Sequence, residues 1–272
     1  MGKRDITVHS MKFEYFCLTD TGLIRDNNED AVLVDDQHHI AVLADGMGGY
    51  NAGEVASAMA ITNIQADLAE WLVESGPHAS AREVKRAMEI CTDNANRRIF
   101  DAAHHNPTFA GMGTTLVLGV FQEGRAFIGH VGDSRCYRLR GREFQLLTRD
   151  HSLLQEQIDA GLLTMEQAQY AVHRNLVTRA LGVEDTVLLE VNEFRLEVGD
   201  LFLLCSDGLN DMLKDDQIAA LLNSHPSLEE KGRALVDAAN ELGGRDNISI
   251  ILIYVQTKST RRGLLSRVLR QH

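Results

Sequence analysis

Four aspartates in the sequence share a setting that suits metal binding. Each stands at the edge of an apolar, strand-like run, beside glycine or another small polar residue: Asp45, Asp133, Asp207 and Asp246. If these strand ends converge in the folded chain, the carboxylates form an all-oxygen cluster, which suits magnesium or manganese rather than zinc. A turn or a helix cap would explain any single one of them, because aspartate favours both. The repetition is what indicates a metal site.

The first of these aspartates leads into a glycine-rich loop. Residues 40–44 are apolar, and four glycines lie within the eight residues that follow Asp45, before a helical pattern begins. Glycine loses much conformational entropy on folding, so its clustering indicates a backbone that approaches another group closely, typically a phosphate or a metal ion. A plain strand-to-helix turn with positive φ angles is the alternative interpretation.

An arginine near the N-terminus could bind phosphate. Arg25 stands four residues ahead of the carboxylate pair Glu29 and Asp30. Its guanidinium presents a fixed fork of donors that matches phosphate oxygens, although a single surface arginine is usually only solvated. Beside a polycarboxylate metal site, such a cation fits metal-assisted hydrolysis of a phosphate ester.

The composition excludes some classes of protein. The chain has 272 residues, of which 44% are hydrophobic, enough for the core of one large domain or two small ones. The net charge is -12 and the isoelectric point is near 5.3, so a role in nucleic-acid binding is not expected. No apolar run approaches the ~20 residues of a membrane-spanning helix, and the first ten residues lack the apolar stretch of a signal peptide.

The cysteines indicate a reducing compartment. Four cysteines are scattered along the chain without a C-x-x-C pair, and each sits in an apolar segment. We therefore expect reduced thiols in the core of a soluble, cytoplasmic protein.

The elements that must position these residues alternate in blocks. Strands are predicted at residues 13–18, 31–34, 40–44, 114–121, 125–128, 136–139, 187–191, 201–205 and 248–255. Apolar residues spaced by three and four predict helices around residues 61–71 and 84–99, and two more helices are predicted over 215–223 and 228–242. Antiparallel strands with segregated helix pairs indicate an α+β fold, in which each of two sheets is covered by a helix pair.

The two ends and one internal segment stand apart from this pattern. We expect a flexible head over residues 1–12, a catalytic domain over 13–256 with a polar insertion, or flap, at about 152–179, and a basic tail over 257–272. The tail carries five Lys and Arg residues from 258 onward and no acid, and its apolar residues could share one helical face. Docking of the tail to an anionic membrane surface or an acidic partner is one hypothesis, and a solvated, disordered end is the alternative.

Together these motifs resemble the metal-dependent serine/threonine protein phosphatases of the PPM, or type 2C, family in their bacterial form. The resemblance covers roughly residues 13–256 and follows the family's order of motifs. These are R-x-x-N-E-D at 25–30 with one extra asparagine, D-G-M-G-G at 45–49, G-M-G-T-T at 111–115, G-D-S-R at 132–135, D-H-S-L at 150–153, S-D-G-L at 206–209 and G-G-x-D-N-I at 243–248. Any one motif is weak evidence, but seven in order are highly specific.

The resemblance implies a role for each site residue. Asp45 would bridge two metal ions, Mn²⁺ or Mg²⁺, and the carbonyl of Gly46 would hold the second ion. Asp207 and Asp246 would ligate the first ion, while Glu29 and Asp30 would act from the outer shell through water. Asp133, with Asp207, would match a weaker third metal site, and Arg25 would bind the substrate phosphate. The family fold is a central β-sandwich of two mainly antiparallel sheets flanked by helix pairs, a four-layer αββα arrangement.

The mechanism implied is direct attack on phosphorus by a hydroxide that bridges the two ions. Metal ions and Arg25 would neutralise the phosphoryl oxygens, so no phosphoenzyme is expected; the H-C-x-x-x-x-x-R signature of cysteine-based phosphatases is missing around the four cysteines. Bacterial relatives often carry a histidine after D-G-M-G-G, where this chain has Tyr50. A phenol is a poorer acid at neutral pH, so the proton donor to the leaving group is left unassigned. His151 and His173 are alternatives, although isolated histidines are more often structural.

The resemblance also implies the partners. We expect phosphorylated proteins as substrates, a bacterial serine/threonine kinase as the enzyme that is opposed, and a monomeric state. Arg174 and Arg179 in the flap could help to hold a phosphopeptide. Two other functions fit the same residues: a regulatory pseudophosphatase that binds phosphoproteins without turnover, and a phosphatase of small phosphoesters. The complete set of metal carboxylates argues against the first of these.

Overall fold

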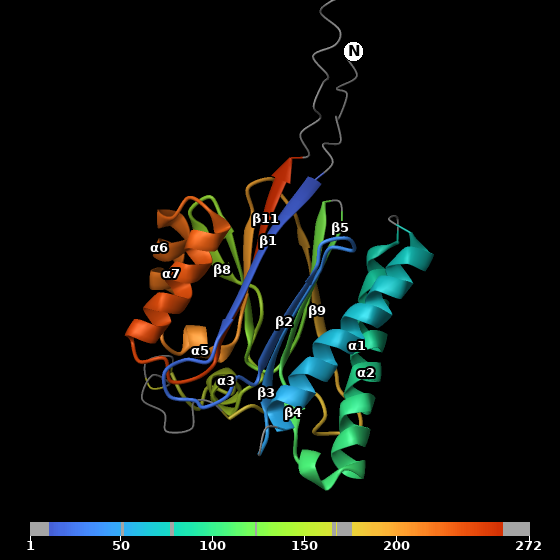
Figure 1. The fold of residues 1–272 in the computed structure, drawn as a ribbon. Helices are drawn as coiled ribbons and strands as arrows, with labels where there is room; N and C mark the ends of the chain where they lie inside the picture. Colours follow the sequence, from blue (N-terminus) through green and yellow to red (C-terminus); the bar gives the residue numbers. More distant parts are fainter. Residues whose placement is uncertain are drawn as a thin grey trace, which may run out of the picture.

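The computed structural model describes residues 11–49, 52–76, 79–122, 124–164, 167 and 176–257. Within these residues the strands form two antiparallel sheets that face each other (Figure 1). The first sheet runs, in spatial order, through β1 (Met11–Asp20), β11 (Ile248–Thr257), β10 (Leu201–Cys205), β7 (Arg135–Arg140) and β8 (Glu143–Leu146). The second runs through β2 (Asp30–Asp35), β3 (Ile40–Met47), β5 (Leu116–Gln122), β6 (Arg125–Val131) and β9 (Glu190–Arg195), and the short β4 (Gly113–Thr114) pairs with the end of β3.

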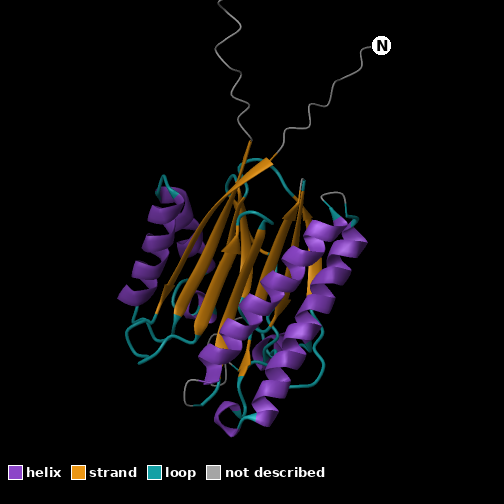
Figure 2. Ribbon diagram, turned by 45° about the vertical axis from the view of Figure 1, so that its right-hand side comes forward, coloured by secondary structure: helices purple, strands orange, loops and turns teal. Residues whose placement is uncertain are grey.

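Two helix pairs cover the outer faces of this sandwich (Figure 2). The second sheet carries α1 (Ala52–Ser75) and α2 (Ala81–His105), and the first carries α6 (Asp215–Ser224) and α7 (Leu228–Glu241). The predicted apolar stripes point inward, as Ile64 and Met88 show by being fully buried. Ser80 and Ser227 begin α2 and α7 with capping boxes, in which each serine accepts a backbone N–H of the first turn. The predicted four-layer α+β architecture is therefore confirmed.

Central strands are apolar on both faces because both faces are covered. In β3, Leu43 points into the core between the two sheets, whereas Val42 faces the core beneath α1 and α2. In β10, Phe202 faces the other sheet and Leu203 faces α6 and α7. This period of two gives each sheet two buried faces, so the ends of these strands are fixed in space.

Two elements of the first and second sheets differ from the sequence prediction. The predicted strand at 187–191 is displaced, because ladder pairing with β6 begins only at Glu190, opposite His130, and runs to Arg195. Leu189 of the predicted run packs instead against the core beneath α1 and α2. The edge strand β8 was not predicted, because only two of its four residues are apolar and none of them is buried.

The chain ends of the domain differ slightly from the predicted boundaries. Strand β1 begins at Met11, inside the predicted head, and pairs along its whole length with β11, which ends at Thr257. Residues 1–10 and 258–272, and with them the basic part of the predicted tail, lie outside the described residues. Of the four cysteines, Cys91, Cys136 and Cys205 are buried as expected, but Cys17 on the edge strand β1 is exposed.

Short helices complete the described chain. These are η1 (Pro107–Phe109), α3 (Leu153–Asp159) at the start of the predicted flap, and α5 (Asp207–Asn210) directly after β10. The base of the flap is closed by a bridge between Ser152 and Val177. None of the helices in the described ranges combines the length and apolarity that a membrane span requires.

Candidate metal centre

One pocket collects the four aspartates. Asp45 lies near the end of β3, Asp133 in the connection from β6 to β7, Asp207 at the first position of α5, and Asp246 two residues before β11. All four line a pocket of about 620 Å³. The strands that carry them belong to both sheets, so the pocket lies where the corresponding ends of the two sheets meet. The convergence expected from the sequence is present.

The other predicted site residues lie at the same place. Arg25, Glu29 and Gly46 line the pocket with the aspartates. Asp30 begins β2 and stands directly opposite Asp45 in the ladder between β2 and β3. It is 9% exposed, so its carboxylate sits beside the pocket and away from bulk water.

Two threonines that sequence reasoning left without a role hold Asp45 in place. The backbone N–H of Thr115 and the hydroxyl of Thr114 donate to the carbonyl of Asp45, at 2.8 and 2.9 Å. The N–H of Asp45 donates in turn to Thr115 Oγ1 at 3.1 Å, and that hydroxyl also bonds Ser134 Oγ at 2.7 Å, next to Asp133. The signal was available, since both threonines close the G-M-G-T-T motif.

Gly46 is required by close packing. A Cβ placed there would lie 2.2 Å from the carbonyl oxygen of Gly53 in α1 and 2.5 Å from that of Glu29. The N–H of Gly46 donates to the same Glu29 carbonyl at 3.1 Å. The glycine-rich loop thus allows the end of β3 to press against the start of α1, which supports the interpretation that its backbone makes a close approach.

Burial and nearby carboxylates raise the pKa of three of the aspartates. Withdrawal from water raises the pKa of Asp45 well above its ordinary value, and the charges of Asp30, Asp207 and Asp133 raise it further. The pKa of Asp207 is raised well above its ordinary value by the same causes, burial first and Asp133 second. Burial also raises the pKa of Asp133 to about 6, with Asp150 adding to the effect. A bound cation would favour the ionised forms and relieve this repulsion.

Asp30 gives an independent test of whether the residues fit hydrated metal ions. Ser206 Oγ donates to Asp30 Oδ2 at 2.7 Å. The other oxygen, Oδ1, is buried and accepts no hydrogen bond from the described residues. A metal-ligating water would supply such a donor, as outer-shell carboxylates in metal sites commonly require. The donor set, carboxylates and backbone carbonyls only, matches magnesium or manganese.

Arg25 reaches into the pocket from its rim. Its Nη2 donates to Asp246 Oδ2 at 2.7 Å, and its side chain stays 53% exposed. This bond uses one of the five guanidinium N–H donors, so others are available to a phosphate. The predicted phosphate-binding cation and a predicted metal ligand are thus neighbours.

Asn247 is a second residue whose role the sequence did not reveal. Its side-chain carbonyl accepts the N–H of Glu29 at 2.8 Å, and its amide donates to the carbonyls of Thr21 and Asn27 at 3.0 and 2.9 Å. One side chain therefore holds the loop that carries Arg25 and Glu29 against the loop that carries Asp246. The asparagine of the G-G-x-D-N-I motif was the available signal.

Several residues considered for substrate binding or proton donation are not placed in the pocket. Tyr50, His173 and Arg174 lie outside the described residues, and Arg179 is exposed. His151 is 7% exposed and contacts the backbone of Gly132. The described pocket therefore leaves the proton donor open.

The family relationship follows from comparison with known proteins. A family model of protein phosphatase 2C matches residues 24–244. The serine/threonine phosphatase stp of Listeria monocytogenes is 36% identical over 238 residues, covering 86% of this chain and 93% of the relative. Protein phosphatase PhpP of Streptococcus pneumoniae is 35% identical over 247 residues, covering 88% of this chain and 96% of the relative.

Solved structures of phosphatases support the same family relationship. The serine/threonine phosphatase PstP of Mycobacterium tuberculosis superposes with a TM-score of 0.81 at 34% identity, covering 90% of this chain and 99% of the other. A catalytic domain of PstP in complex with two manganese ions gives a TM-score of 0.79 at 34% identity, covering 91% and 100%. That complex supports a divalent metal cofactor for this chain. With this fold, this sequence identity and the ordered motifs, the chain belongs to the protein phosphatase 2C family of metal-dependent serine/threonine phosphatases.

Proposed function

We propose that this chain hydrolyses phosphoserine and phosphothreonine esters in proteins, using two divalent ions held by its aspartates. The observation that carries the proposal is the convergence of Asp45, Asp133, Asp207 and Asp246 in one pocket with the half-exposed Arg25. Burial and neighbouring carboxylates raise the pKa of Asp45 and Asp207, so their ionised forms are unfavourable without cations. A cation-binding pocket beside a guanidinium that uses only one of its donors fits a phosphate ester.

The ligand assignment follows the predicted roles. Asp45 would bridge the two ions, the Gly46 carbonyl would hold one of them, Asp207 and Asp246 would hold the other, Glu29 and Asp30 would bind through water, and Asp133 with Asp207 would hold a third. When bound, the two ions would lower the pKa of a water molecule towards neutrality and offset charge on the phosphoryl oxygens. The choice between manganese and magnesium is left to experiment.

The residues of the chain would orient the ester. Arg25 would exchange its single bond to Asp246 for bonds to phosphate oxygens, because its planar fork matches two of them. Asn247 would keep Arg25 at the pocket rim by holding the loop of residues 21–29. Thr114 and Thr115 would keep the Asp45 carboxylate aimed at the same point.

The relatives support phosphoproteins as the substrate class, since they are named protein or serine/threonine phosphatases. We propose that the chain opposes a bacterial serine/threonine kinase and acts as a monomer. A phosphatase of small phosphoesters would use the same ligands, and a pseudophosphatase would bind without turnover. The complete carboxylate set favours turnover over binding alone.

A direct assay separates these functions. We expect hydrolysis of an aryl phosphate and of a phosphothreonine peptide on addition of manganese, and loss of both activities with a chelator. Turnover that survives chelation would contradict the metal mechanism. Faster turnover of a sugar phosphate than of the peptide would favour the small-molecule function, and manganese-dependent peptide binding without hydrolysis would favour the pseudophosphatase.

Two further proposals concern location and the tail. All four cysteines are free, which supports a reducing compartment such as the cytoplasm. For the basic residues from 258 onward we keep the hypothesis of docking to an anionic membrane surface or an acidic partner. Deletion of residues 258–272 should then change vesicle or partner binding without changing aryl-phosphate turnover. Unchanged binding of the shortened chain would contradict it.

A further inference from the structure

His151 pairs with Gly132 through both its backbone and its side chain. The N–H of His151 donates to the carbonyl of Gly132 at 2.9 Å, and the N–H of Gly132 donates to His151 Nδ1 at 3.1 Å. Gly132 has a φ of 103° and immediately precedes Asp133. The side chain of His151, 19 residues further along the chain, thus fixes the left-handed turn at Gly132 that positions the carboxylate of Asp133.

The same histidine is bonded through its backbone to residues 176–178 of the flap, which we call the flap wall. The N–H of Thr178 donates to the carbonyl of His151 at 2.8 Å, and the next bond of the ladder joins the N–H of Leu153 to the carbonyl of Leu176 at 2.9 Å. Leu176 and Val177 line the pocket. His151 therefore stands between the loop of Asp133 and the flap wall, and touches both through hydrogen bonds.

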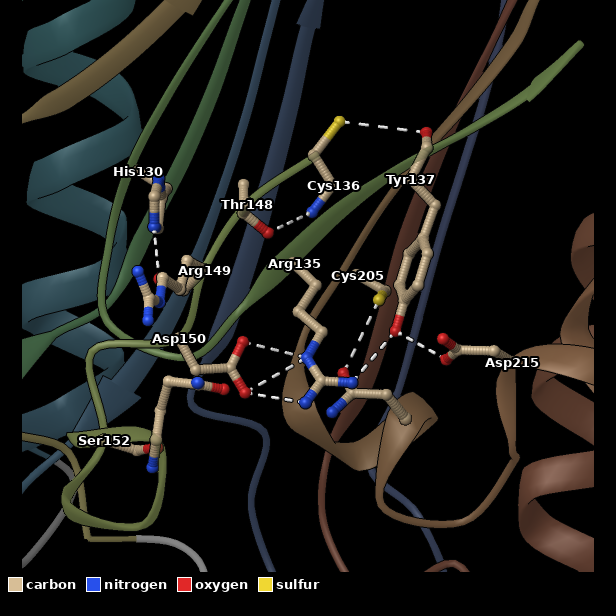
Figure 3. Close-up of polar contacts among 12 residues, drawn as sticks. His130, Arg135, Cys136, Tyr137, Thr148, Arg149, Asp150, Ser152, Cys205 and Asp215 are labelled. Atoms are coloured by element: carbon tan, nitrogen blue, oxygen red, sulfur yellow. Dashed lines mark hydrogen bonds and ion pairs between the residues drawn. The ribbon is translucent and has the colours of Figure 1, made fainter. Parts of the chain in front are cut away.

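An ion pair fixes the residue before the histidine. Arg135 Nη2 donates to Asp150 Oδ2 at 2.6 Å, and Arg135 Nε donates to Asp150 Oδ1 at 2.9 Å (Figure 3). The same guanidinium donates from Nη1 to the hydroxyl of Tyr137, which bonds Asp215 at the start of α6. The entry to the flap is thus tied to β7, so His151 has little freedom to leave Gly132.

Hydrogen bonds also define where the imidazole protons lie. His151 Nδ1 accepts a backbone N–H, so in the neutral ring its proton is on Nε2. His130 stacks on His151 with ring centroids 4.7 Å apart. Its Nε2 donates to the carbonyl of Arg149 at 2.7 Å (Figure 3). The groups facing His151 are His130 of β6, Arg179 after the flap wall and Glu190 of β9. Burial, His130 and Arg179 lower the pKa of His151 more than Glu190 raises it, which favours the neutral ring.

These proton positions argue against a metal ion at the histidines. One ligand atom each of His130, His151 and Glu190 lies within 4.8 Å of the others. A cation on His151 Nε2 would require the ring proton to move to Nδ1, where it would oppose the N–H of Gly132. One water molecule fits these groups better than a metal ion. It could donate to His130 Nδ1 and to the Glu190 carboxylate and accept the proton of His151 Nε2.

We propose that His151 is a positioning residue for catalysis, which acts as a neutral hydrogen-bond acceptor that couples the Asp133 loop to the flap wall at residues 176–178. The inference rests on the proposed function, because Asp133 and the flap wall both line the pocket that would bind the phosphopeptide. Loss of the Nδ1 acceptor removes the side-chain bond to Gly132 and leaves the Asp133 loop joined to residue 151 by one backbone bond, so the loop is held less firmly against the flap wall.

Two amide variants test the proposal. In His151→Asn the side-chain oxygen can occupy the place of Nδ1, whereas in His151→Gln the amide reaches the place of Nε2 and leaves Gly132 without its acceptor. We expect manganese-dependent kcat on a phosphothreonine peptide to stay within about threefold of wild type in His151→Asn. It should fall about tenfold in His151→Gln and in His151→Leu, the effect of one lost buried hydrogen bond.

Exchange of the backbone amides provides a readout that does not depend on turnover. NMR-detected hydrogen exchange at Gly132 should be faster in His151→Gln and His151→Leu than in His151→Asn and wild type, whereas Thr178, whose partner is the backbone carbonyl of residue 151, serves as the control. Equal turnover in the Asn and Gln variants would overturn the proposal, even if exchange differs, because the bond would then serve stability alone. Inactive wild-type protein in the presence of manganese would contradict the proposed function. Active wild-type protein with equal kcat in His151→Asn and His151→Gln would contradict only the inference about His151.

Discussion

The lining of the pocket has two parts. In the first, which we call the sheet-borne side, the aspartates stand at or just beyond the ends of paired strands; in the second, the flap side, Leu176 and Val177 belong to a short flap segment. Strand β3 is flanked by β2 and β5, and β10 by β7 and β11, so ladders on both sides fix the strand that carries Asp45 and the strand that precedes Asp207. The flap segment is joined to residues 151–153 by single backbone bonds, and Leu176 is 54% exposed.

This difference separates two tasks. The sheet-borne side holds carboxylates that repel one another, which requires a rigid support, because each raised pKa reflects an unfavourable charge in the folded state. The flap side is an exposed segment with few bonds, which tolerates variation, and on the proposed function a protein substrate would contact it. Changes on the sheet-borne side should therefore abolish chemistry, and changes on the flap side should alter substrate selection.

The largest effect is expected from Asp207→Asn. Loss of this ligand should lower manganese-dependent aryl-phosphate turnover at least about 100-fold, since bound ions contribute several kcal/mol to the transition state. Without metal, the same variant should unfold at a higher temperature than wild type, because one repelling carboxylate is gone. Thermal unfolding in chelator and turnover with manganese measure both. A less stable but active variant would contradict the assignment.

A smaller loss is expected from Arg25→Ala. Removal of a charge-assisted contact to phosphate should reduce kcat/KM by about 30-fold, equivalent to about 2 kcal/mol. Arg25→Lys should recover part of this loss, since it keeps the charge but not the fork. Steady-state kinetics on a phosphothreonine peptide provides the comparison. Equal kcat/KM in wild type and Arg25→Ala would exclude Arg25 from phosphate binding.

The pH dependence of stability tests the repulsion on the sheet-borne side. Burial raises the pKa of Asp133 from 3.8 to about 6, so the folded metal-free protein holds this proton more tightly than the unfolded chain. The free energy of unfolding should therefore fall as the pH rises from about 4 to about 6, by on the order of 2 kcal/mol from this group. Urea unfolding in chelator should show a shallower fall in Asp133→Asn. Parallel curves for the two proteins would contradict the effect.

The smallest effect is expected on the flap side. Leu176→Ala removes apolar contact area next to the pocket, and we expect KM for a phosphothreonine peptide to rise about threefold with kcat unchanged. Leu162→Ala is the matched control, because Leu162 is a 72% exposed flap leucine and is not among the residues that line this pocket. Turnover of a small aryl phosphate should be the same in all three proteins. A large loss of kcat in Leu176→Ala would contradict the claim that the flap side affects substrate selection and not the chemical step.

The sequence predicted the sheet-borne side well because its signals are local. Each aspartate is marked by the apolar run before it or after it and by adjacent small residues, and the order of motifs identified the family. The strand at 187–191 was displaced because Leu189 is apolar for packing beneath the helices and not for ladder pairing. Local patterns cannot distinguish these two reasons for burial.

Local sequence patterns could not predict the hydrogen bonds that hold the site residues in place. Thr115 bonds Asp45 across 70 positions, and Asn247 bonds Glu29 across 218. His151 was considered as an acid from its type alone, and its bond to Gly132 emerges only when the flap entry is folded against β6 and β7. Such partners depend on register and topology, which single motifs do not contain.

Calorimetric titration of the metal-free protein with manganese tests the central claim most directly. If the converging carboxylates form a dinuclear centre, wild type should bind at least about two ions per chain, and Asp45→Asn should lose binding at both, because one carboxylate bridges them. Binding of manganese to Asp45→Asn with wild-type stoichiometry and affinity would contradict the account.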